Sequence, residues 1–274
     1  MRLLARCLLL VVFAGLAIST SAPAATHPAL PLADGWSLQT SALVKGSGEE
    51  ISSPQYRPQG WHAATVPTTV VSALVKNGVY PDPYYGKNLR SIPGTSYPIG
   101  ENFSNLPMPS DSPFNVPWWF RTEFQVPAEY ADKAVSLHFD GINYRANIWL
   151  NGKKIADARE VAGAFRRYEF DVTATVLPGK ANVLAVEIFA PTERDLAITF
   201  VDWNPQPPDK NMGLWRRVYL STSGPVTVRH PFVESRIDFS SPVAAHLTVV
   251  ADLKNHSQQN VKGTMRARIG EILM

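Results

Sequence analysis

The sequence predicts an all-β protein in which a jelly-roll β-sandwich is followed by an incomplete immunoglobulin-like β-sandwich. Apolar runs of strand length recur from Trp118 onward, with turn residues between them and no helical segments among them. The chain also has 23 prolines and 17 glycines, which favours many short strands and turns. All 7 tryptophans lie between Trp36 and Trp215. Because the character of the chain changes near Gly224, we expect a domain boundary there.

The first 24 residues have the pattern of a secretory signal peptide. Arg2 and Arg6 precede an apolar run that ends at Ile18, and small residues at Ala22 and Ala24 fit a cleavage site. The apolar run is too short to span a bilayer, so we expect no membrane anchor. The sequence therefore predicts a protein that is secreted or periplasmic.

Composition excludes several classes of function. Cys7, the single cysteine, lies in the predicted signal peptide, so we expect neither disulfides nor cysteine-bound metal in the mature chain. The formal charge of +3 falls when Arg2 and Arg6 are removed, and no Lys/Arg stripe remains to attract nucleic acid. The histidines are scattered and no phosphate-binding glycine motif occurs, so we expect no metal and no cofactor.

The region before Trp118 contains one predicted helix. Residues 34–66 are typical of an initial strand and a polar connection. Val70, Val71 and Leu74 then share one helical face, and Gly78 is a typical stop signal. Residues 81–117 have no sustained period but are rich in aromatic residues, which favours an ordered, functional connection over a disordered one.

Six strands are predicted from Trp118 to Ser223, at 118–127, 134–141, 145–158, 167–176, 182–190 and 215–223. Asn151-Gly152 predicts a two-residue hairpin of type I′. Three more strands are expected at 225–239, 245–255 and 261–272, which is about half of an immunoglobulin-like sandwich. We therefore expect a signal peptide at 1–24, a jelly-roll domain at 25–224 and a partial immunoglobulin-like domain at 225–274, as in a truncated fragment.

Four stretches together resemble glycoside hydrolase family 2, in particular its exo-β-D-glucosaminidases and β-mannosidases. They are "HFDGINYRANIWLNGKKIA", "GLWRRVYL", "VPTTVVSALVKNGVYPDPYYGKNL" and "VDWNPQPPDKNMGLWR". The resemblance spans residues 34–222 and continues weakly beyond. It implies a galactose-binding-like jelly roll that binds sugar at the N-terminus of an exported, exo-acting enzyme.

The chain departs from the family pattern in one decisive way. The resemblance implies a downstream (β/α)₈ barrel that carries two catalytic carboxylates, but the sequence has no alternating βα pattern of the length a barrel needs. It also lacks the Asn-Glu dipeptide of the family's acid/base strand. We therefore assign no catalytic residue here and expect residues 25–274 alone to be inactive.

The resemblance points to four substrate-binding candidates. Asp202 and Trp203 lie in the segment that resembles the family's substrate loop, where a carboxylate accepts sugar hydroxyls and an indole covers the C–H face. The alternative interpretation is structural: Asp202 caps a turn, and Trp203 is buried beside it. Asp82 and Asn88 flank "PYYGK" in a second such loop, and turn chemistry around the prolines is their alternative.

Other conspicuous residues favour structural roles. Trp215 and Arg216 are expected to close the core and pair a carboxylate, and the tryptophans at 118, 119 and 149 to pack on the sheets. Glu193 and Asp195 could share a face of a strand, but no neighbouring apolar pocket would raise the pKa of one of them as acid catalysis requires.

Three hypotheses for function remain open. The first is the substrate-binding portion of an exo-β-D-glucosaminidase-like enzyme, which acts on an amino sugar or oligosaccharide with a downstream barrel of the same polypeptide. The second is a stand-alone carbohydrate-binding module, which rests on fold analogy. The third is a domain that stabilises a barrel without touching substrate.

Overall fold

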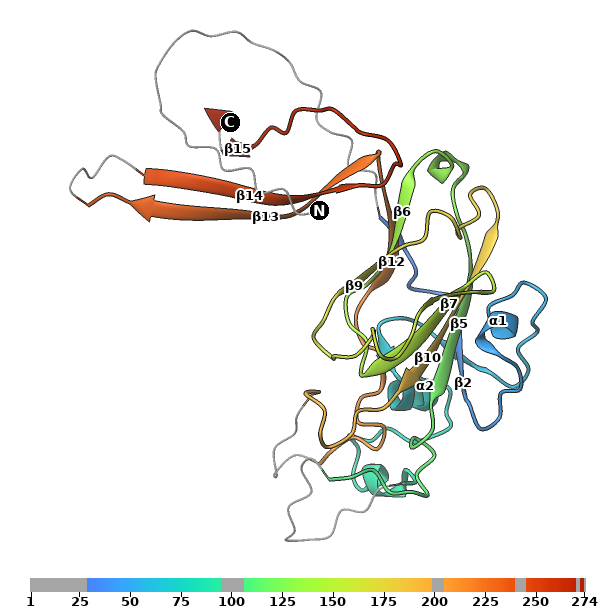
Figure 1. The fold of residues 1–274 in the computed structure, drawn as a ribbon. Coiled ribbons are helices and arrows are strands. Elements are labelled where there is room, and N and C mark those ends of the chain that lie inside the picture. The colour runs from blue at the N-terminus through green and yellow to red at the C-terminus, as the bar shows by residue number, and fades with distance from the viewer. Residues whose placement is uncertain (1–28, 95–105, 199–204, 240–244, 270–271, 274) are drawn as a thin grey trace, which may run out of the picture. The chain divides into compact units, whose positions relative to one another are not determined.

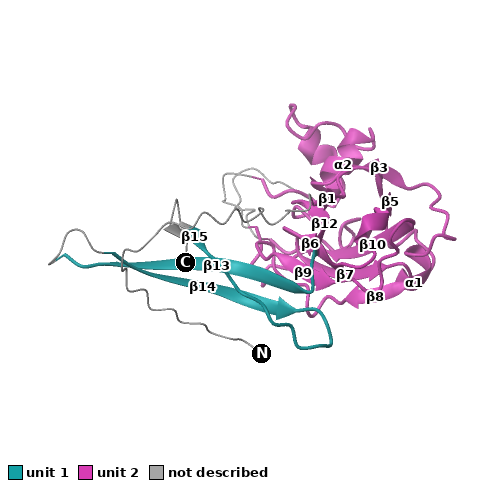
Figure 2. Ribbon diagram, turned by 90° about the horizontal axis from the view of Figure 1, so that it is seen from above, with its two compact units in different colours: residues 1–27, 223–274 teal, residues 28–222 magenta. Residues whose placement is uncertain are grey.

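The structure is a computed structural model that describes residues 29–94, 106–198, 205–239, 245–269 and 272–273. The chain divides into two compact units, one formed by residues 28–222 and the other by residues 1–27 and 223–274 (Figure 2). The elements of the larger unit are mostly strands, which confirms the predicted all-β class. No helix in the described ranges is both long and apolar enough to cross a membrane.

Two antiparallel sheets build the larger unit (Figure 1). The larger sheet has the order β3 (His62–Ala64), β2 (Trp36–Thr40), β5 (Trp118–Gln125), β10 (Ala181–Phe189), β7 (Arg145–Leu150) and β8 (Lys153–Ala156). The smaller sheet has the order β1 (Leu30–Pro31), β12 (Val218–Ser223), β6 (Ala134–Phe139) and β9 (Tyr168–Asp171). Most neighbours are distant in sequence, as crossovers between the sheets of a jelly roll require.

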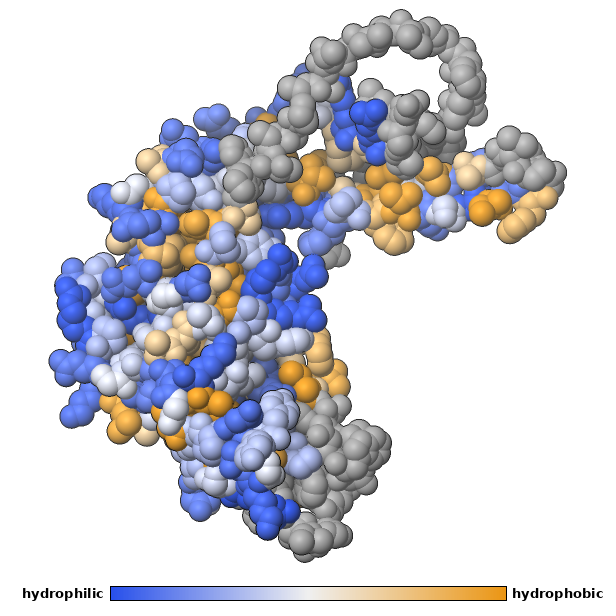
Figure 3. Space-filling model, turned by 180° about the vertical axis from the view of Figure 1, so that it is seen from behind, coloured by the Kyte–Doolittle hydropathy of each residue, from blue (hydrophilic) through white to orange (hydrophobic). Residues whose placement is uncertain are grey.

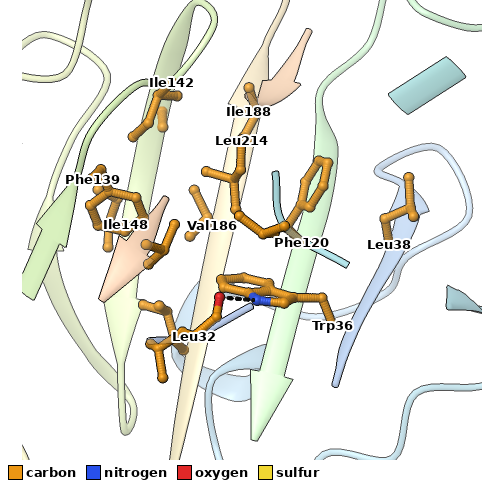
Figure 4. Packing of buried hydrophobic residues seen from close by; sticks show 14 of the residues in the cluster. Leu32, Trp36, Leu38, Phe120, Phe139, Ile142, Ile148, Val186, Ile188 and Leu214 are labelled. Carbon is orange, nitrogen blue, oxygen red and sulfur yellow. Dashed lines mark hydrogen bonds between the residues drawn. The ribbon is translucent and has the colours of Figure 1, made fainter. Parts of the chain in front are cut away.

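The main core consists of the apolar side chains that alternate along these strands. Phe120, Phe139, Ile148 and Val186 are among its members, and Figure 4 shows them together with Trp36. The Trp36 indole N–H donates a hydrogen bond of 2.9 Å to the carbonyl of Leu32, so this large side chain is buried without an unsatisfied donor (Figure 4).

The opposite face of the six-stranded sheet holds a second apolar cluster. Trp119 points away from the main core and packs on Trp149, with ring centroids 5.3 Å apart. The short helix α1 (Gly48–Ile51) contributes Ile51 to this cluster. Glycine is required at position 48, because a Cβ atom there would lie 2.1 Å from the Trp149 ring. The sequence analysis missed α1, although Ser47 and Glu50 form a capping box at its start.

The predicted hairpin and the predicted helix are both present. Asn151 and Gly152 join β7 to β8 with φ values of 52° and 79°, as a type I′ turn requires. Helix α2 (Val70–Lys76) begins after Thr69, whose side chain accepts a hydrogen bond from the Ser72 amide. A small sheet of β4 (Thr68–Thr69) and β11 (Gly213–Leu214) joins the start of this helix to the segment before β12.

The connections of the larger unit contain two 3₁₀ turns, η1 (Asn88–Ser91) and η2 (Ala128–Tyr130). The first lies in the aromatic-rich connection of residues 81–117, of which residues 95–105 lie outside the described ranges. Ile92 and Phe114 from this connection are buried in the main core, so the described part of the connection is anchored to the sandwich.

The smaller unit is built around a two-stranded antiparallel ribbon of β13 (Val226–Ile237) and β14 (Ala245–Asn255). Its register shifts between Arg229 and Phe232, where His230 has a φ of 49°. Hydrophobic side chains gather on the ribbon (Figure 3), and Val228, Phe232 and Leu253 are exposed there. The third expected strand, at 261–272, is reduced to β15 (Arg268–Ile269) and β16 (Ile272–Leu273), because residues 261–267 join no ladder.

Candidate functional site

A buried carboxylate fixes the segment that follows the predicted substrate loop. Asp209 has no exposed surface. Its Oδ2 accepts a hydrogen bond of 2.7 Å from the Val71 amide in the first turn of α2, and its Oδ1 accepts one of 2.9 Å from the Asn211 amide. Burial raises the pKa of this carboxyl to about 6, although the hydrogen bonds act in the opposite direction. Asp209 therefore ties residues 209–211 to the helix.

A buried amide holds the same segment from the other side. The side-chain nitrogen of Asn143 donates to the carbonyls of Lys210 and Asn211, both at 2.9 Å. These two residues have φ values of 51° and 57°, a region that non-glycine residues seldom adopt. The backbone of Asn143 also exchanges two hydrogen bonds with Gly213. The conformation of residues 209–213 is thus determined by partners on both sides.

A pocket of about 810 Å³ opens beside this segment. Three parts of the larger unit line it: helix α2, residues 82–90 and the proline-rich stretch 205–211. Its lining includes Val71, Val75, Asp82, Tyr84, Arg90, Pro205 and Asp209. Tyr84 is 97% exposed, so its ring stands at the rim in a position to contact a ligand. The pocket combines an apolar wall with several charged groups, as binding sites for small polar molecules do.

The structure separates the roles of Asp82 and Asn88. Asp82 lines the pocket, and its Oδ1 accepts a hydrogen bond of 2.9 Å from the Tyr84 amide. The side-chain nitrogen of Asn88 instead donates to the carbonyl of Asp82 at 3.0 Å and closes the loop. Asn88 is not among the residues that line this pocket. Asp82 and Asn88 therefore each make one hydrogen bond that stabilises the turn of their own loop. Asp82 also lines the pocket.

Asp202 and Trp203, the other two candidates, lie outside the described residues. Pro205 is the first described residue after them, and it lines the pocket.

The conspicuous aromatic and charged residues occupy structural positions. Trp215 donates from its indole nitrogen to the carbonyl of Ala164 at 2.9 Å and packs against Gly141. The Arg216 guanidinium lies over the Trp215 ring, 4.5 Å from its centroid. The ion pair that was expected of Arg216 is made by Arg217, whose guanidinium lies 2.8 Å from an Asp140 carboxylate oxygen.

Asp195 is engaged in an ion pair rather than poised for acid catalysis. The Arg145 guanidinium donates to both of its carboxylate oxygens, one of them at 2.7 Å. Hydrogen bonding from Arg145 lowers the pKa of Asp195 to about 2, with further donation from Thr192. A carboxyl group in this state stays ionised at neutral pH and cannot donate a proton to a leaving group. In the part of the chain that the structure describes, no three His, Cys, Asp or Glu side chains gather to hold a metal ion.

Sequence reasoning missed Asn143, Asp209 and Lys210, three residues that shape the site. Asn143 lies between the strands predicted at 134–141 and 145–158, in a stretch that resembles the family but in which no single residue was selected as part of a site. The sequence signal for the other two is the run Asp209-Lys-Asn-Met-Gly213, in which Asp, Asn and Gly are the residue types that tolerate left-handed turns. The partner across the fold that makes Asp209 a buried acceptor cannot be read from local sequence.

Comparisons with known proteins agree with the resemblance drawn from the four sequence motifs. The family profile described as "Glycosyl hydrolase 2 galactose-binding domain-like" matches residues 111–201. An exo-β-D-glucosaminidase of Streptomyces avermitilis is 35% identical over 237 residues, which cover 86% of this chain and 24% of that protein. An exo-β-D-glucosaminidase of Arthroderma benhamiae is 35% identical over 252 residues, which cover 90% of this chain and 26% of that protein.

Solved structures give the same picture. The crystal structure of an exo-chitosanase from Amycolatopsis orientalis is similar with a TM-score of 0.71 and 33% identity, over 85% of this chain and 25% of that one. The β-D-mannosidase of Dictyoglomus thermophilum, at 21% identity and a TM-score of 0.59, shares the fold. The predicted resemblance and the galactose-binding-like fold are confirmed. The chain spans about a quarter of the length of these glucosaminidases and of the exo-chitosanase.

Proposed function

We propose that this chain, which carries the galactose-binding-like domain of glycoside hydrolase family 2, is the substrate-binding N-terminal portion of an exported exo-β-D-glucosaminidase. The observation that carries the proposal is the identity of 35% to glucosaminidases of a bacterium and a fungus over most of this chain. The pocket beside α2 supports it, because proline-stiffened and aromatic segments converge there on a fixed scaffold.

In this proposal the larger unit supplies binding and orientation rather than bond cleavage. Asp82 and Tyr84 contact the sugar from one loop, while Asp202 and Trp203 contact it from the other. Asp209 and Asn143 hold the end of the second loop in place, which reduces the ordering cost of binding. Retaining hydrolysis would need two carboxyl groups about 5 to 5.5 Å apart, and we assign these to a downstream barrel domain.

The test compares the full-length protein encoded by the source gene with residues 25–274 alone. The full-length protein is expected to release glucosamine from chitosan oligosaccharides and to hydrolyse the matching mannosides more slowly. The shorter chain is expected to release nothing. Glucosaminide turnover by the shorter chain would contradict the assignment of the chemistry to a downstream domain.

A carbohydrate-binding module without catalytic activity is the second candidate. The exposed rings of Tyr84 and Tyr85 favour it, because exposed aromatic rings are a common platform for sugars. Calorimetric titration of residues 25–274 with glucosamine oligomers separates the two candidates. Binding that disappears in Tyr84→Ala, together with no hydrolysis by the full-length protein, would favour the module.

Export completes the proposal. Residues 1–24 are assigned as a signal peptide that directs the protein to the periplasm or the medium. N-terminal sequencing of the mature protein tests this, with cleavage after Ala24 as the expected result.

A further inference from the structure

One sequence pattern, an aromatic residue followed by two arginines, occurs twice in the larger unit. Phe165-Arg-Arg167 lies just before strand β9, and Trp215-Arg-Arg217 lies just before strand β12. Both strands flank β6 in the four-stranded sheet. Phe139 pairs with Tyr168, and the Asp140 amide donates to the Arg217 carbonyl, so both runs meet at the end of β6.

Aromatic contacts join the two runs to each other. The Trp215 indole N–H donates to the carbonyl of Ala164 at 2.9 Å. The Trp215 ring meets the edge of the Phe165 ring, with centroids 5.7 Å apart and planes at 85°. A Cβ atom on Gly141 would lie 3.2 Å from the Arg216 side chain, so the end of β6 passes close beside the second run.

A shared carboxylate joins the arginines of the two runs. The guanidinium of Arg217 lies 2.8 Å from one oxygen of Asp140, and that of Arg167 lies 3.9 Å from the other oxygen. Residues 165–167, residues 215–217 and Asp140 therefore form one continuous surface, which we call the Arg-aromatic patch.

The Arg-aromatic patch is open to solvent. The side chains of Arg167 and Arg217 are 78% and 76% exposed, and Phe165 is 66% exposed. An exposed phenyl ring beside exposed arginines adds nothing to the core, and aromatic residues and arginine are enriched at binding surfaces. None of the patch residues lines the pocket beside α2, so the patch is a separate surface.

The patch carries more positive than negative charge. Asp140 is shared by two of its arginines, and in the described ranges Arg216 makes neither a hydrogen bond nor an ion pair. Glu169, two positions after Arg167, adds one further carboxylate, so four arginines stand beside two acidic residues. This excess of positive charge attracts anionic ligands.

The position of Arg216 leaves its hydrogen-bond donors available. Its guanidinium lies over the Trp215 ring, 4.5 Å from the centroid. This stacking uses the flat face of the guanidinium, while the N–H groups lie at its edge, where they can pair with a carboxylate in the bidentate manner. The ring thus orients the cation without consuming its donors.

The repeated pattern indicates the kind of anion. The two guanidiniums at Asp140 show that arginines of this patch converge on a carboxylate. Exposed aromatic rings such as that of Phe165 can cover the C–H face of a pyranose. A polymer of uronic acids offers a pyranose ring and a carboxylate in every unit, so it matches a surface that presents a ring and two arginines twice.

We propose that the Arg-aromatic patch binds an acidic polysaccharide, a chain of uronate residues. Arg216 and Arg217 pair with its carboxylates, and Phe165 covers one of its sugar rings. Glucosamine oligomers carry the opposite charge, so this ligand is not the substrate of the proposed enzyme. The choice of a saccharide rests on the proposed function, whereas the excess charge and the exposed ring do not.

The experiment is calorimetric titration of the full-length protein with tetragalacturonate. Its fully methyl-esterified form is the matched probe, because it keeps the sugar rings and removes the charges. The acid is expected to bind at least about tenfold more tightly than the ester, because hydrogen bonds between charged groups are the stronger ones. Raising the ionic strength from about 0.05 to about 0.5 M is expected to weaken the binding of the acid, since salt screens exposed charges.

Three variants make the result specific to the patch. Arg216→Gln is expected to weaken binding of the acid about fivefold or more, through the loss of a charged donor. Phe165→Ala is expected to weaken binding of both the acid and the ester, because it removes the ring that covers the sugar. Arg57→Gln, an exposed arginine next to the second apolar cluster on the other sheet, is the control and should bind as the wild type does.

Equal affinity for the acid and the ester would overturn the proposal, and so would wild-type affinity in Arg216→Gln. A lowered Tm in Arg216→Gln with unchanged affinity would make this arginine structural. Tighter binding of tetraglutamate, or of a thymidine oligonucleotide of equal charge, would also overturn the proposal and assign the patch to an acidic peptide or to nucleic acid.

The outcome separates this inference from the proposed function. A full-length protein that hydrolyses glucosaminides but does not bind tetragalacturonate loses only the Arg-aromatic patch as a binding site. A protein that binds tetragalacturonate through the patch but hydrolyses no glucosaminide loses only the enzyme assignment.

Discussion

Asp209 accepts a hydrogen bond from the amide of Val71, a residue 138 positions earlier in the chain, and this contact joins the start of helix α2 to the end of the predicted substrate loop. The carboxylate is fully buried and also accepts from the Asn211 amide. Because it replaces water as the acceptor for two backbone donors, it determines where residues 209–211 lie.

The raised pKa of Asp209 predicts a specific pH dependence of stability. Its carboxyl titrates at about 6 in the folded protein and near 3.8 when unfolded, so the folded state binds the proton more tightly. The free energy of unfolding should therefore decrease as the pH rises from about 4 to about 6 through this group. Urea unfolding across that range is expected to show the decrease in the wild type but not in Asp209→Asn. An identical slope in both proteins would contradict the assignment.

Asp195 should have the opposite effect. Its pKa of about 2 in the folded protein lies below the unfolded value, because the Arg145 guanidinium donates to the ionised form. The stabilisation is fully present above pH 4 and is lost as the pH falls toward 2. Asp195→Asn should remove up to about 2 kcal/mol at neutral pH and flatten the acid limb of the unfolding curve. Arg145→Met should likewise reduce the loss of stability below pH 4. If neither Asp195→Asn nor Arg145→Met reduces that loss, the Arg145–Asp195 ion pair is not its cause.

Gly213 tests the close approach of two backbone segments. Its φ is 155°, and a Cβ atom there would lie 2.5 Å from the Thr68 carbonyl oxygen across the β4–β11 pair. Gly213→Ala is expected to destabilise the protein by about 2 to 4 kcal/mol, since backbone atoms must move to admit the methyl group. Gly224→Ala is the matched control, because nothing lies within 4 Å of its added Cβ. Thermal unfolding of both variants tests this prediction: the Tm of Gly213→Ala should be lower than that of Gly224→Ala. Equal Tm values would refute the predicted clash.

The sequence predicted the elements with local signals and missed those that depend on distant partners. Helix α2 and the hairpin at Asn151-Gly152 were found because capping, helical periodicity and turn residues are local. Helix α1 has only four residues, so its apolar pattern was too short to detect despite its capping box. The strand expected at 261–272 has an apolar alternation, but within the described ranges no strand pairs with residues 261–267.

The candidate site was predictable in outline only. Asp82 and the stretch 205–211 do line one pocket, as two converging loops should. The sequence offered both a ligand role and a turn role for Asn88, because an amide that closes its own loop has the same local pattern as one that faces a sugar; the structure shows the contact within the loop, and the ligand role stays a prediction. The buried acceptor Asp209 and the clamp at Asn143 involve residues far apart in the chain, which only the fold brings together.

A substitution of Asp202 tests whether the domain contacts substrate or only stabilises a barrel. In the full-length protein, Asp202→Ala is expected to lower kcat/KM for a glucosaminide at least about tenfold, because a carboxylate that accepts sugar hydroxyls is lost. Its Tm should match that of the wild type. Asp132→Ala, at an exposed position before β6, is the control and should leave kcat/KM unchanged. Wild-type kinetics in Asp202→Ala would favour a domain that only supports its barrel.

The central claim is tested most directly by the hydrolysis of p-nitrophenyl β-D-glucosaminide by the full-length protein. The account predicts turnover of this substrate, slower turnover of the matching β-mannoside and no turnover by residues 25–274 alone. A folded full-length protein that binds glucosamine oligomers but hydrolyses neither glycoside would contradict it and leave a carbohydrate-binding module in its place.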